Sequence, residues 1–377
     1  MLGKHLVEKF GNNVKERERF NGEKEYYFEF PLTNTLNELT ELTEACGYKL
    51  FSDRTVANNR YIVYTSEQET VYISYTFKLG CIRVFTQKET PFTGCNGKVI
   101  CEEAGLVLMN MKYGDDCQVS HDNGLGLIVT LSDGSFIVYD GGYAVDADKL
   151  LAFLTENAPH GENPTVRAWV ITHTHKDHYG NFDFFVRNYS DKVEIQNIIA
   201  CIVDDKYYSN GKVQDRYFSD ILPELAQSKG IPVITPVSGQ IYSFSGVRME
   251  ILHTAEDLYP LPVASENHSS TLTRLYFDGQ NKTALIMGDL ARSSVTFALT
   301  TWGNYLKSDI LQIPHHGHSG ATKELYYTVD PQTVLFPTSD EHYACRIKTN
   351  EAWNHYLIND LQVKEVFVAD NKYKKIL

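Results

Sequence analysis

Hydrophobic and polar positions change their spacing near residue 105, which divides the chain into two parts. In the first part, three leucines recur at helical spacing within residues 33–46. Segments that alternate apolar with other residues, as half-buried strands do, follow at 60–65, 70–77 and 80–86. The pattern predicts a small α+β domain over residues 1–104, with a linker rich in Gly and Pro at 90–98.

The second part, residues 105–377, mixes apolar strands with amphipathic helices. Strands are expected at 126–131, 135–140, 165–172, 195–203, 247–252, 272–277, 283–287, 309–313, 333–336 and 365–368. Helices are expected at 145–157, 177–189, 215–229, 321–328 and 350–360. Strands interspersed with helices favour a layered α/β domain, with sheets inside and helices outside.

Charge narrows the range of partners. The chain of 377 residues has 35 Lys and Arg against 48 Asp and Glu, a net charge of −13. Residues 1–115 hold 14 of the basic and 16 of the acidic residues, so the remainder, 21 against 32, carries −11. This balance argues against broad contact with nucleic acid or an anionic membrane. The sequence predicts a small-molecule substrate instead.

The compartment is inferred from apolar runs and cysteines. No run of about 18 apolar residues is present, and the first 20 residues lack the apolar core of a secretion signal. The seven cysteines are scattered and include no C-x-x-C pair, which disfavours a disulfide framework. We expect a cytoplasmic protein without a membrane span.

Metal-ligating side chains gather where the apolar strand at 165–172 ends. His173 and His175 lie two residues apart, so on extended chain they point the same way and can address one metal. Asp177 and His178 follow at the start of a predicted helix, where the chain has turned and their side chains can reach a second metal position. Neutral imidazole and ionised carboxylate are ligands for zinc, iron and related divalent metals.

Three later segments complete the candidate site. Asp289 follows an apolar strand and Gly288, and its carboxylate could bridge two metals. His315 and His316 also end a strand, and because adjacent residues point to opposite sides we expect only one to be a ligand. His268, in the segment Glu-Asn-His-Ser-Ser at 266–270, precedes another strand and is a further candidate.

Together these motifs resemble the metallo-β-lactamase superfamily over about residues 105–377. The matching segments are His173-x-His175-x-Asp177-His178, Gly288-Asp289, His315-His316-Gly317 and, after an earlier strand, Asp140-Gly141-Gly142. The His-His-Gly segment is most similar to the branch that contains the hydrolase domain of DNA-uptake competence proteins and phosphorylcholine esterases. The resemblance implies a four-layer αββα sandwich with a dinuclear metal site at one edge, and phosphoester chemistry.

The resemblance also implies roles for the candidate ligands. His173 and His175 would bind one metal, and Asp177 and His178 the other. Asp289 would bridge both metals, and His316 rather than His315 would complete the second. The family's middle histidine corresponds to His268, with His253 as a rival and a site without a third histidine as another possibility. Asp140 would lie close behind the ligands.

The ligand set predicts a metal-dependent hydrolase. Two divalent ions, zinc first and manganese or iron as alternatives, would lower the pKa of water and polarise the bond under attack. Asp177 and His315 are the catalytic candidates, and His315 would hydrogen-bond a phosphoryl oxygen or protonate the leaving group. We expect the substrate to be a phosphate ester, most simply a small phosphodiester.

Other functions remain open on the same residues. A lactone, thioester or amide could be attacked by the same hydroxide. A nuclease is disfavoured by the acidic charge, and a di-iron flavoprotein oxidoreductase by His175, where that branch has glutamate. A binding protein with a vestigial site is disfavoured by the complete ligand set. The N-terminal domain carries no recognisable chemistry, and we expect it to act as a lid or to form a homodimer.

Overall fold

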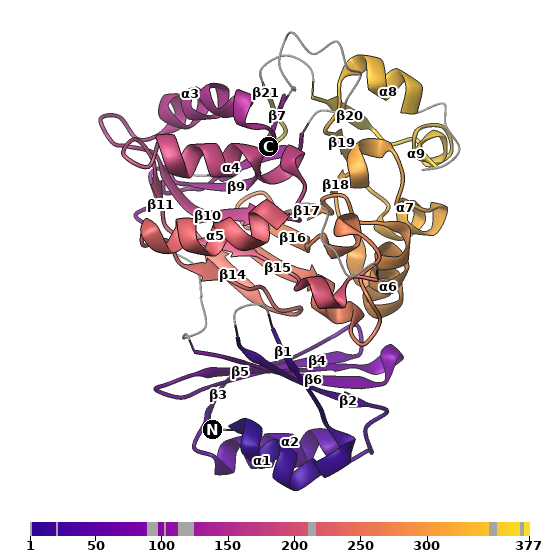
Figure 1. The fold of residues 1–377 in the computed structure, drawn as a ribbon. Helices are drawn as coiled ribbons and strands as arrows, with labels where there is room; N and C mark the ends of the chain where they lie inside the picture. Colours follow the sequence, from indigo (N-terminus) through magenta and orange to yellow (C-terminus); the bar gives the residue numbers. More distant parts are fainter. Residues whose placement is uncertain are drawn as a thin grey trace.

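The computed structural model describes residues 2–19, 22–88, 97–101, 103–111, 124–209, 216–346, 353–369 and 373–377. An N-terminal unit, residues 2–88, holds one six-stranded antiparallel sheet in the order β1-β2-β6-β5-β4-β3 (Figure 1). Its strands are β1 (Lys15–Glu18), β2 (Lys24–Glu29), β3 (Lys49–Val56), β4 (Asn59–Thr65), β5 (Thr70–Thr76) and β6 (Cys81–Gln87). The helices α1 (Leu2–Phe10) and α2 (Thr35–Ala45) cover one face of this sheet.

The rest of the chain contains two larger sheets. The first has the order β13-β12-β10-β9-β8-β7-β21, and β11 also pairs with β10. Its strands are β7 (Gly105–Met109), β8 (Gly126–Thr130), β9 (Phe136–Asp140), β10 (Thr165–Ile171), β11 (Glu194–Ile195), β12 (Ile198–Ala200), β13 (Val233–Ile234) and β21 (Tyr373–Lys375). Strands β9, β10 and β12 run parallel, so their carboxyl ends share one edge.

The second sheet has the order β14-β15-β16-β17-β18-β19-β20. Its strands are β14 (Ile241–Phe244), β15 (Val247–His253), β16 (Leu272–Phe277), β17 (Lys282–Ile286), β18 (Ile310–Gln312), β19 (Thr333–Phe336) and β20 (Glu365–Val368). Strands β14 to β17 are antiparallel, whereas β17 to β20 are parallel. The carboxyl ends of β17 and β18 therefore lie side by side.

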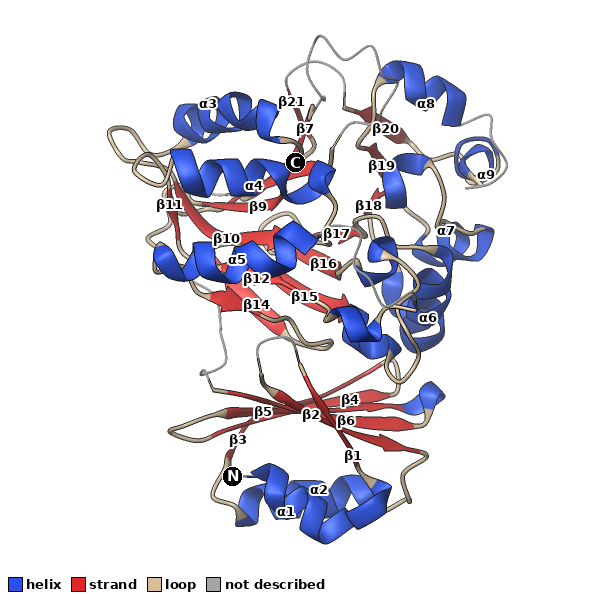
Figure 2. Cartoon of the chain, in the orientation of Figure 1, coloured by secondary structure: helices blue, strands red, loops and turns tan. Residues whose placement is uncertain are grey.

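These two sheets and the flanking helices form four layers (Figure 2). Apolar residues from the facing sides of both sheets make one buried core, for example Val129, Ile137, Met249 and Leu275. The helices α3 (Ala147–Asn157), α4 (Lys176–Asn188) and α5 (Arg216–Ser228) cover the first sheet, and α6 (Arg292–Trp302), α7 (Lys323–Val329) and α9 (Asn354–Asn359) cover part of the second. A further helix, α8 (Asp340–Arg346), follows β19. This is the expected αββα sandwich.

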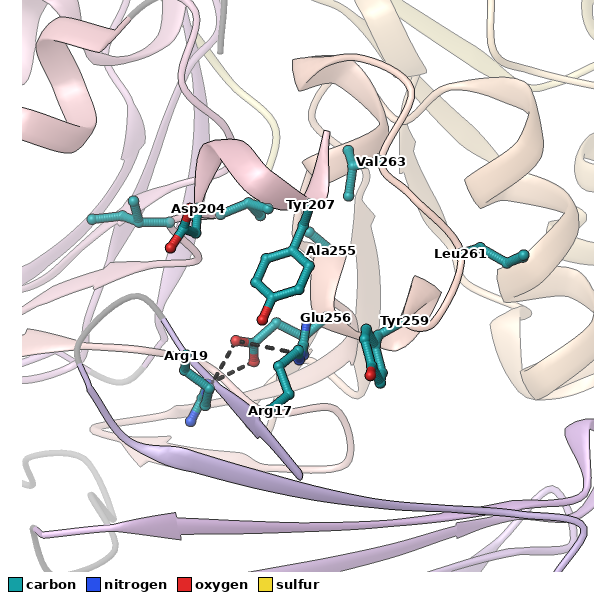
Figure 3. A pocket seen from close by; sticks show the side chains of 11 residues that line it. Arg17, Arg19, Asp204, Tyr207, Ala255, Glu256, Tyr259, Leu261 and Val263 are labelled. Atoms are coloured by element: carbon teal, nitrogen blue, oxygen red, sulfur yellow. Dashed lines mark hydrogen bonds and ion pairs between the residues drawn. The ribbon is translucent and has the colours of Figure 1, made fainter. Parts of the chain in front are cut away.

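The uncovered face of the N-terminal sheet packs on the sandwich through buried charges, which we call the interface charge cluster; Figure 3 shows three of its members, Arg17, Arg19 and Glu256. Its members are Arg17, Arg19, Glu23, Glu25, Arg83 and Glu256. Glu256, in the 3₁₀ turn at Ala255–Leu258 after β15, pairs with Arg19 across the interface at 2.8 Å. Figure 3 shows Arg17 beside Tyr207 and Tyr259, whose ring centres lie 4.9 and 4.5 Å from its guanidinium.

Several predicted elements differ from those observed. The single strand expected at 195–203 is two short strands, β11 and β12, separated by Gln196 and Asn197. The predicted pattern did not indicate α1, β1, β2 or β3. Most of the linker expected at 90–98 lies outside the described residues, and the domain boundary at 104/105 stays a prediction. No helix in the described part of the chain is long and apolar enough to cross a bilayer.

Candidate metal centre

The candidate ligands follow the carboxyl ends of three strands, β10 in the first sheet and the parallel pair β17 and β18 in the second. His173 and His175 follow β10, and Asp177 and His178 lie in the first turn of α4. Asp289 follows β17. His315 and His316 lie in the short turn Pro314–Gly317 after β18. The two sheets thus bring segments more than 100 residues apart in sequence to one edge of the sandwich.

The structure gathers these side chains into two groups that share one carboxylate. One group is His173, His175 and Asp289, and the other is Asp177, His178, Asp289 and His316. Within each group, the potential ligand atoms all lie within 4.8 Å of one another. We call the six residues the ligand cluster. Asp289 Oδ2 lies 3.3 Å from His178 Nε2, 3.4 Å from His316 Nε2 and 3.9 Å from His173 Nε2.

Hydrogen bonds behind the cluster turn two imidazoles toward its centre. His178 Nδ1 lies 2.8 Å from Asp140 Oδ2, and His316 Nδ1 donates to the carbonyl of Pro337 at 2.9 Å. These contacts leave Nε2 of both rings facing the carboxylates. Both Nε2 atoms are buried without a hydrogen-bond partner among the described residues, as is Asp289 Oδ1. Buried polar atoms are normally satisfied, so this arrangement fits a bound cation.

The electrostatics of the cluster point the same way. Burial alone would raise the pKa of Asp289, but His178 and His316 hold that pKa well below its usual range. Burial likewise opposes the charged form of His316, yet Asp289 and Asp177 raise its pKa to about 10. Burial lowers the pKa of His173 far below its usual value. Without a cation, protons on imidazoles therefore balance the carboxylates, and a divalent metal would replace those protons.

The backbone around the cluster is tightly constrained. Gly288 has φ +54°, and a Cβ there would lie 2.8 Å from Thr172 Cβ. His315 and His316 both adopt left-handed conformations, with φ +52° and +50°. Such conformations are uncommon outside glycine and gather at functional sites, where the surrounding structure enforces them. Here the amide of His315 donates to the carbonyl of Gly288 at 3.1 Å, which ties the two ligand loops together.

The family profile of the metallo-beta-lactamase superfamily matches residues 125–325, more than half of the chain, and that range includes every member of the ligand cluster. The chain belongs to this superfamily. Its members are generally metal-dependent hydrolases, and the chain is an enzyme of that kind.

The chain is similar in sequence to one curated protein and in fold to several solved structures. ComE operon protein 3 of Bacillus subtilis is 21% identical over 169 residues, which cover 45% of this chain and 19% of that protein. The chain thus matches about a fifth of this curated relative. Among solved structures, the metallo-beta-lactamase fold protein YhfI from Bacillus subtilis is 12% identical with a TM-score of 0.43, covering 71% of this chain and 99% of that one. Yeast PDE1 is 12% identical with a TM-score of 0.44, covering 73% and 100%.

The predicted middle ligand of the superfamily site is not brought into the cluster. His268 belongs to neither ligand group, and its Nδ1 lies 2.9 Å from Ser265 Oγ. His253 is also outside both groups: it is fully buried, 3.3 Å from a carboxylate oxygen of Asp257. Of the alternatives left open by the sequence, a centre without a third histidine agrees with this geometry.

His315 lies at the rim of the metallo-beta-lactamase centre. Its Nε2 is 4.0 Å from Asp289 Oδ2 and 3.2 Å from the amide nitrogen of Asn267, while its Nδ1 is 2.8 Å from Ser319 Oγ. The side chain is 28% exposed, whereas that of His316 is 2% exposed. Burial lowers the pKa of His315 below its usual value. Of the two adjacent histidines, His316 joins the ligand cluster and His315 faces the opening.

Glu266 is a residue whose place at the superfamily centre sequence reasoning missed. It was considered only as a neighbour of His268, yet its side chain is 1% exposed and its Oε2 lies 3.7 Å from His175 Nε2. His175 Nδ1 faces His173 Nε2 at 2.9 Å. A carboxylate behind a histidine ligand fixes the ring and raises its basicity. The sequence carried no signal for this role, because the burial of Glu266 is visible only in the structure.

Proposed function

We propose that the protein hydrolyses a phosphate ester, most simply a small phosphodiester, with two divalent cations held by the ligand cluster. The observation that carries this proposal is the sharing of Asp289 between the two ligand groups. Bound divalent cations lower the pKa of water and, as an adjacent pair, stabilise the attacking and leaving oxygens of a displacement at phosphorus. The imidazole-rich set favours zinc, and the carboxylates also suit manganese or iron.

The protein's own side chains prepare this centre. His173 and His175 would hold one cation, and Asp177, His178 and His316 the other. Asp140 fixes His178: its two oxygens accept from the amide and hydroxyl of Thr172 at 2.7 and 2.8 Å, and the second also meets the imidazole. This arrangement keeps the ligand nitrogens pointing inward before a cation arrives, which reduces the reorganisation on binding.

His315 would act on the substrate. Its position beside Asp289 and its partial exposure support a role in contacting a phosphoryl oxygen or the leaving group. Such a group can hydrogen-bond the substrate and transfer a proton, which typically contributes about 10²–10⁴-fold to a rate. Asp177 is the second proposed catalytic residue, together with His315. Its Oδ2 lies 3.2 Å from His316 Nε2, so we propose that it acts as a ligand close to the reacting atoms.

The proposed partners follow from charge. The net charge of −13 supports a small-molecule substrate rather than nucleic acid. We also propose that residues 1–104 form a separate domain and that the protein can form a homodimer. In the structure, the N-terminal sheet is covered by its helices on one face and by the sandwich on the other. An interface between copies would therefore involve the edges or the helices of this unit.

Hydrolysis of bis(p-nitrophenyl) phosphate tests the proposal. The protein is stripped of metal with a chelator, dialysed, refilled with zinc or manganese, and assayed while metal content is measured by mass spectrometry. His175→Ala is the variant that removes a ligand, and Glu162→Gln, at an exposed position, is the matched control. We expect turnover that requires metal, disappears in His175→Ala and persists in Glu162→Gln.

The two negative outcomes have different meanings. Two bound metals without phosphodiester turnover would reject the phosphodiester and shift the assay to lactones, thioesters and amides, which need the same centre. Failure to bind any divalent metal, with the chain folded, would contradict the proposed function as a whole. Metal-dependent turnover that survives His175→Ala would reject the assignment of the ligands.

A further inference from the structure

A cleft that shares no residue with the ligand cluster lies between the N-terminal unit and the outer face of the second sheet. Its volume is about 580 Å³, within the range typical of small-molecule sites. Strand β3 of the N-terminal unit forms one wall, and β14, β15, β16 and the turn after α6 form the other. On β16 the lining begins at Arg274, three residues and about 10 Å along the strand from Thr271, whose amide donates to the carbonyl of Thr172 beside the candidate ligands.

The lining of this cleft is basic in an acidic protein. Four cationic side chains and one carboxylate line it: Arg54, Arg248, Arg274, Lys307 and Glu250. Arg248 and Lys307 have carboxylate partners, Asp278 at 3.0 Å and Asp330 at 2.7 Å, but both pairs are about half exposed. Exposed pairs of this kind contribute little stability and exchange partners readily. The cleft therefore has cations available to an incoming anion.

Glu250 neutralises one of these cations, Arg54, and leaves the other three without a share of its charge through direct contact. It is fully buried, and Arg54 donates to its Oε1 at 2.6 Å. The hydroxyls of Tyr276 and Tyr305 donate to its Oε2 at 3.0 and 2.7 Å. Burial raises the pKa of both tyrosines, so these hydroxyls keep their protons. One arginine and two hydroxyls thus satisfy the only carboxylate in the lining.

Aromatic rings hold the remaining arginines in place. The guanidinium of Arg274 lies 4.8 Å from the ring centre of Tyr276 and 4.9 Å from that of Tyr305. Arg248 lies 4.9 Å from the ring of Tyr276. The stack continues through Trp302, whose ring centre is 5.6 Å from that of Tyr305. Stacking on a ring face orients a guanidinium while its N–H groups stay free for a ligand.

Arg274 makes no direct ion pair with any described residue, although Glu250 lies opposite it on the neighbouring strand. Among the described residues it has no carboxylate within ion-pair distance; its Nη1 donates to the carbonyl of Tyr305, and its buried Nε has no hydrogen-bond partner. A partly buried guanidinium in this state gains from an anion that brings oxygen acceptors.

We propose that this cleft binds a small phosphorylated molecule with two or more negative charges. The stacked guanidinium groups match the geometry of phosphate oxygens, and Arg248 and Lys307 add positive charge at the mouth. Because Arg54 belongs to the N-terminal unit and Arg274 to the second sheet, the ligand contacts both parts and stabilises their docking. This site is separate from the metal centre and does not depend on its chemistry.

Calorimetric titration of the full chain with pyrophosphate tests the proposal. Metal is removed first, because pyrophosphate would also bind divalent cations. The variants are Arg274→Gln, which removes the stacked cation, and Arg60→Gln, a half-exposed arginine outside the cleft that pairs with Asp53. We expect one equivalent bound by the wild type, affinity at least about tenfold weaker in Arg274→Gln, and affinity within about twofold in Arg60→Gln.

Three results would overturn the proposal. The first is no binding by the folded wild type at millimolar pyrophosphate, and the second is unchanged affinity in Arg274→Gln. The third is loss of binding in His316→Ala, which would place the anion among the protonated imidazoles of the ligand cluster. If Arg274→Gln does not fold, Arg248→Gln replaces it, since that side chain is 48% exposed and its removal leaves the core intact. Its expected loss is about threefold or more, and unchanged affinity rejects the site.

Discussion

The interface charge cluster and the ligand cluster both bury several charges, but they neutralise them differently. In the first, three arginines meet three glutamates, and both Arg19 and Arg83 have pKa values raised by the glutamates beside them despite burial. In the second, the only cations are imidazoles, which hold protons because Asp177 and Asp289 are adjacent. A cluster that contains permanent cations is complete in itself and holds the fold together. A cluster balanced only by titratable protons is ready to exchange them for metal.

The largest expected effect comes from removing the shared ligand. Asp289→Asn deletes the charge common to both groups, so we expect metal-dependent turnover to fall by about 10³-fold or more, equivalent to about 4 kcal/mol of transition-state stabilisation. Bound metal should fall from two equivalents to at most one. The free energy of unfolding of the metal-free protein should not decrease by more than about 1 kcal/mol, since the neighbouring imidazoles can release protons when the carboxylate charge is removed, which an arginine cannot do.

The matched control for this change is Asp330→Asn, an exposed residue in a left-handed conformation that asparagine tolerates. Its turnover and metal content should equal those of the wild type. If Asp289→Asn lowers the free energy of unfolding of the metal-free protein by several kcal/mol, the ligand cluster stabilises the fold. The contrast with the interface charge cluster would then be wrong.

At the interface charge cluster we expect a substitution to lower the stability of the fold. Glu25 is fully buried and contacts both Arg17 and Arg83, the latter at 2.6 Å. Glu25→Gln removes the counter-charge from two buried arginines and should lower the free energy of unfolding by about 3–5 kcal/mol. Glu29→Gln, on the same strand, breaks a surface pair with Lys15 and should change the free energy of unfolding by less than about 1 kcal/mol. Denaturant titration of both variants measures the difference, and equal values would contradict it.

The same contrast explains which parts of the molecule could be predicted from sequence. The candidate ligands His173 to His178 could be predicted because an apolar strand precedes them, whereas the roles of Asp289 and His316 came from the resemblance to the family; the structure gathers all of them in one cluster. Strands β1 and β2 were missed because their buried face carries charge: Arg17 and Glu25 read as exposed positions in the polar–apolar pattern. Glu266 was missed for the same reason. Burial of a charge depends on a partner distant in sequence, which local periodicity does not report.

Glu266 offers a smaller test of how the ligand cluster is supported. Its Oε2 lies 3.7 Å from His175 Nε2, so Glu266→Gln should leave the ligands in place but weaken their orientation. We expect affinity for zinc to fall by about 10–100-fold at one of the two sites, measured by competition with a chromogenic chelator. Glu324→Gln, an exposed residue in the first turn of α7, is the control. Loss at both sites, or at neither, would contradict a role limited to His175.

The smallest expected change in stability comes from Asp133, in the β8–β9 turn. Its charge is stabilised in a third way, mainly by hydrogen-bond donors. Its carboxylate accepts from Ser245 Oγ at 2.9 Å, Gly97 N at 3.0 Å and Arg167 Nη2 at 3.1 Å, so one charge joins three segments. Although burial opposes ionisation, Ser135, Ser245 and Arg167 lower the pKa of Asp133. Asp133→Asn should lower the free energy of unfolding by about 1.5 kcal/mol at pH 7.

The sign of its pH dependence follows from the lowered pKa. The stabilisation is fully present above the unfolded value of about 3.9 and is lost as pH falls through the folded value, because the folded state binds the proton less readily than the unfolded one. Urea titrations between pH 7 and pH 3 should therefore show wild type and Asp133→Asn converging at the acid end. A gap that widens on acidification would mean that Asp133 is not held ionised by its donors. Asp133 would then resemble neither the interface charge cluster, which arginines neutralise, nor the ligand cluster, which protons on imidazoles neutralise.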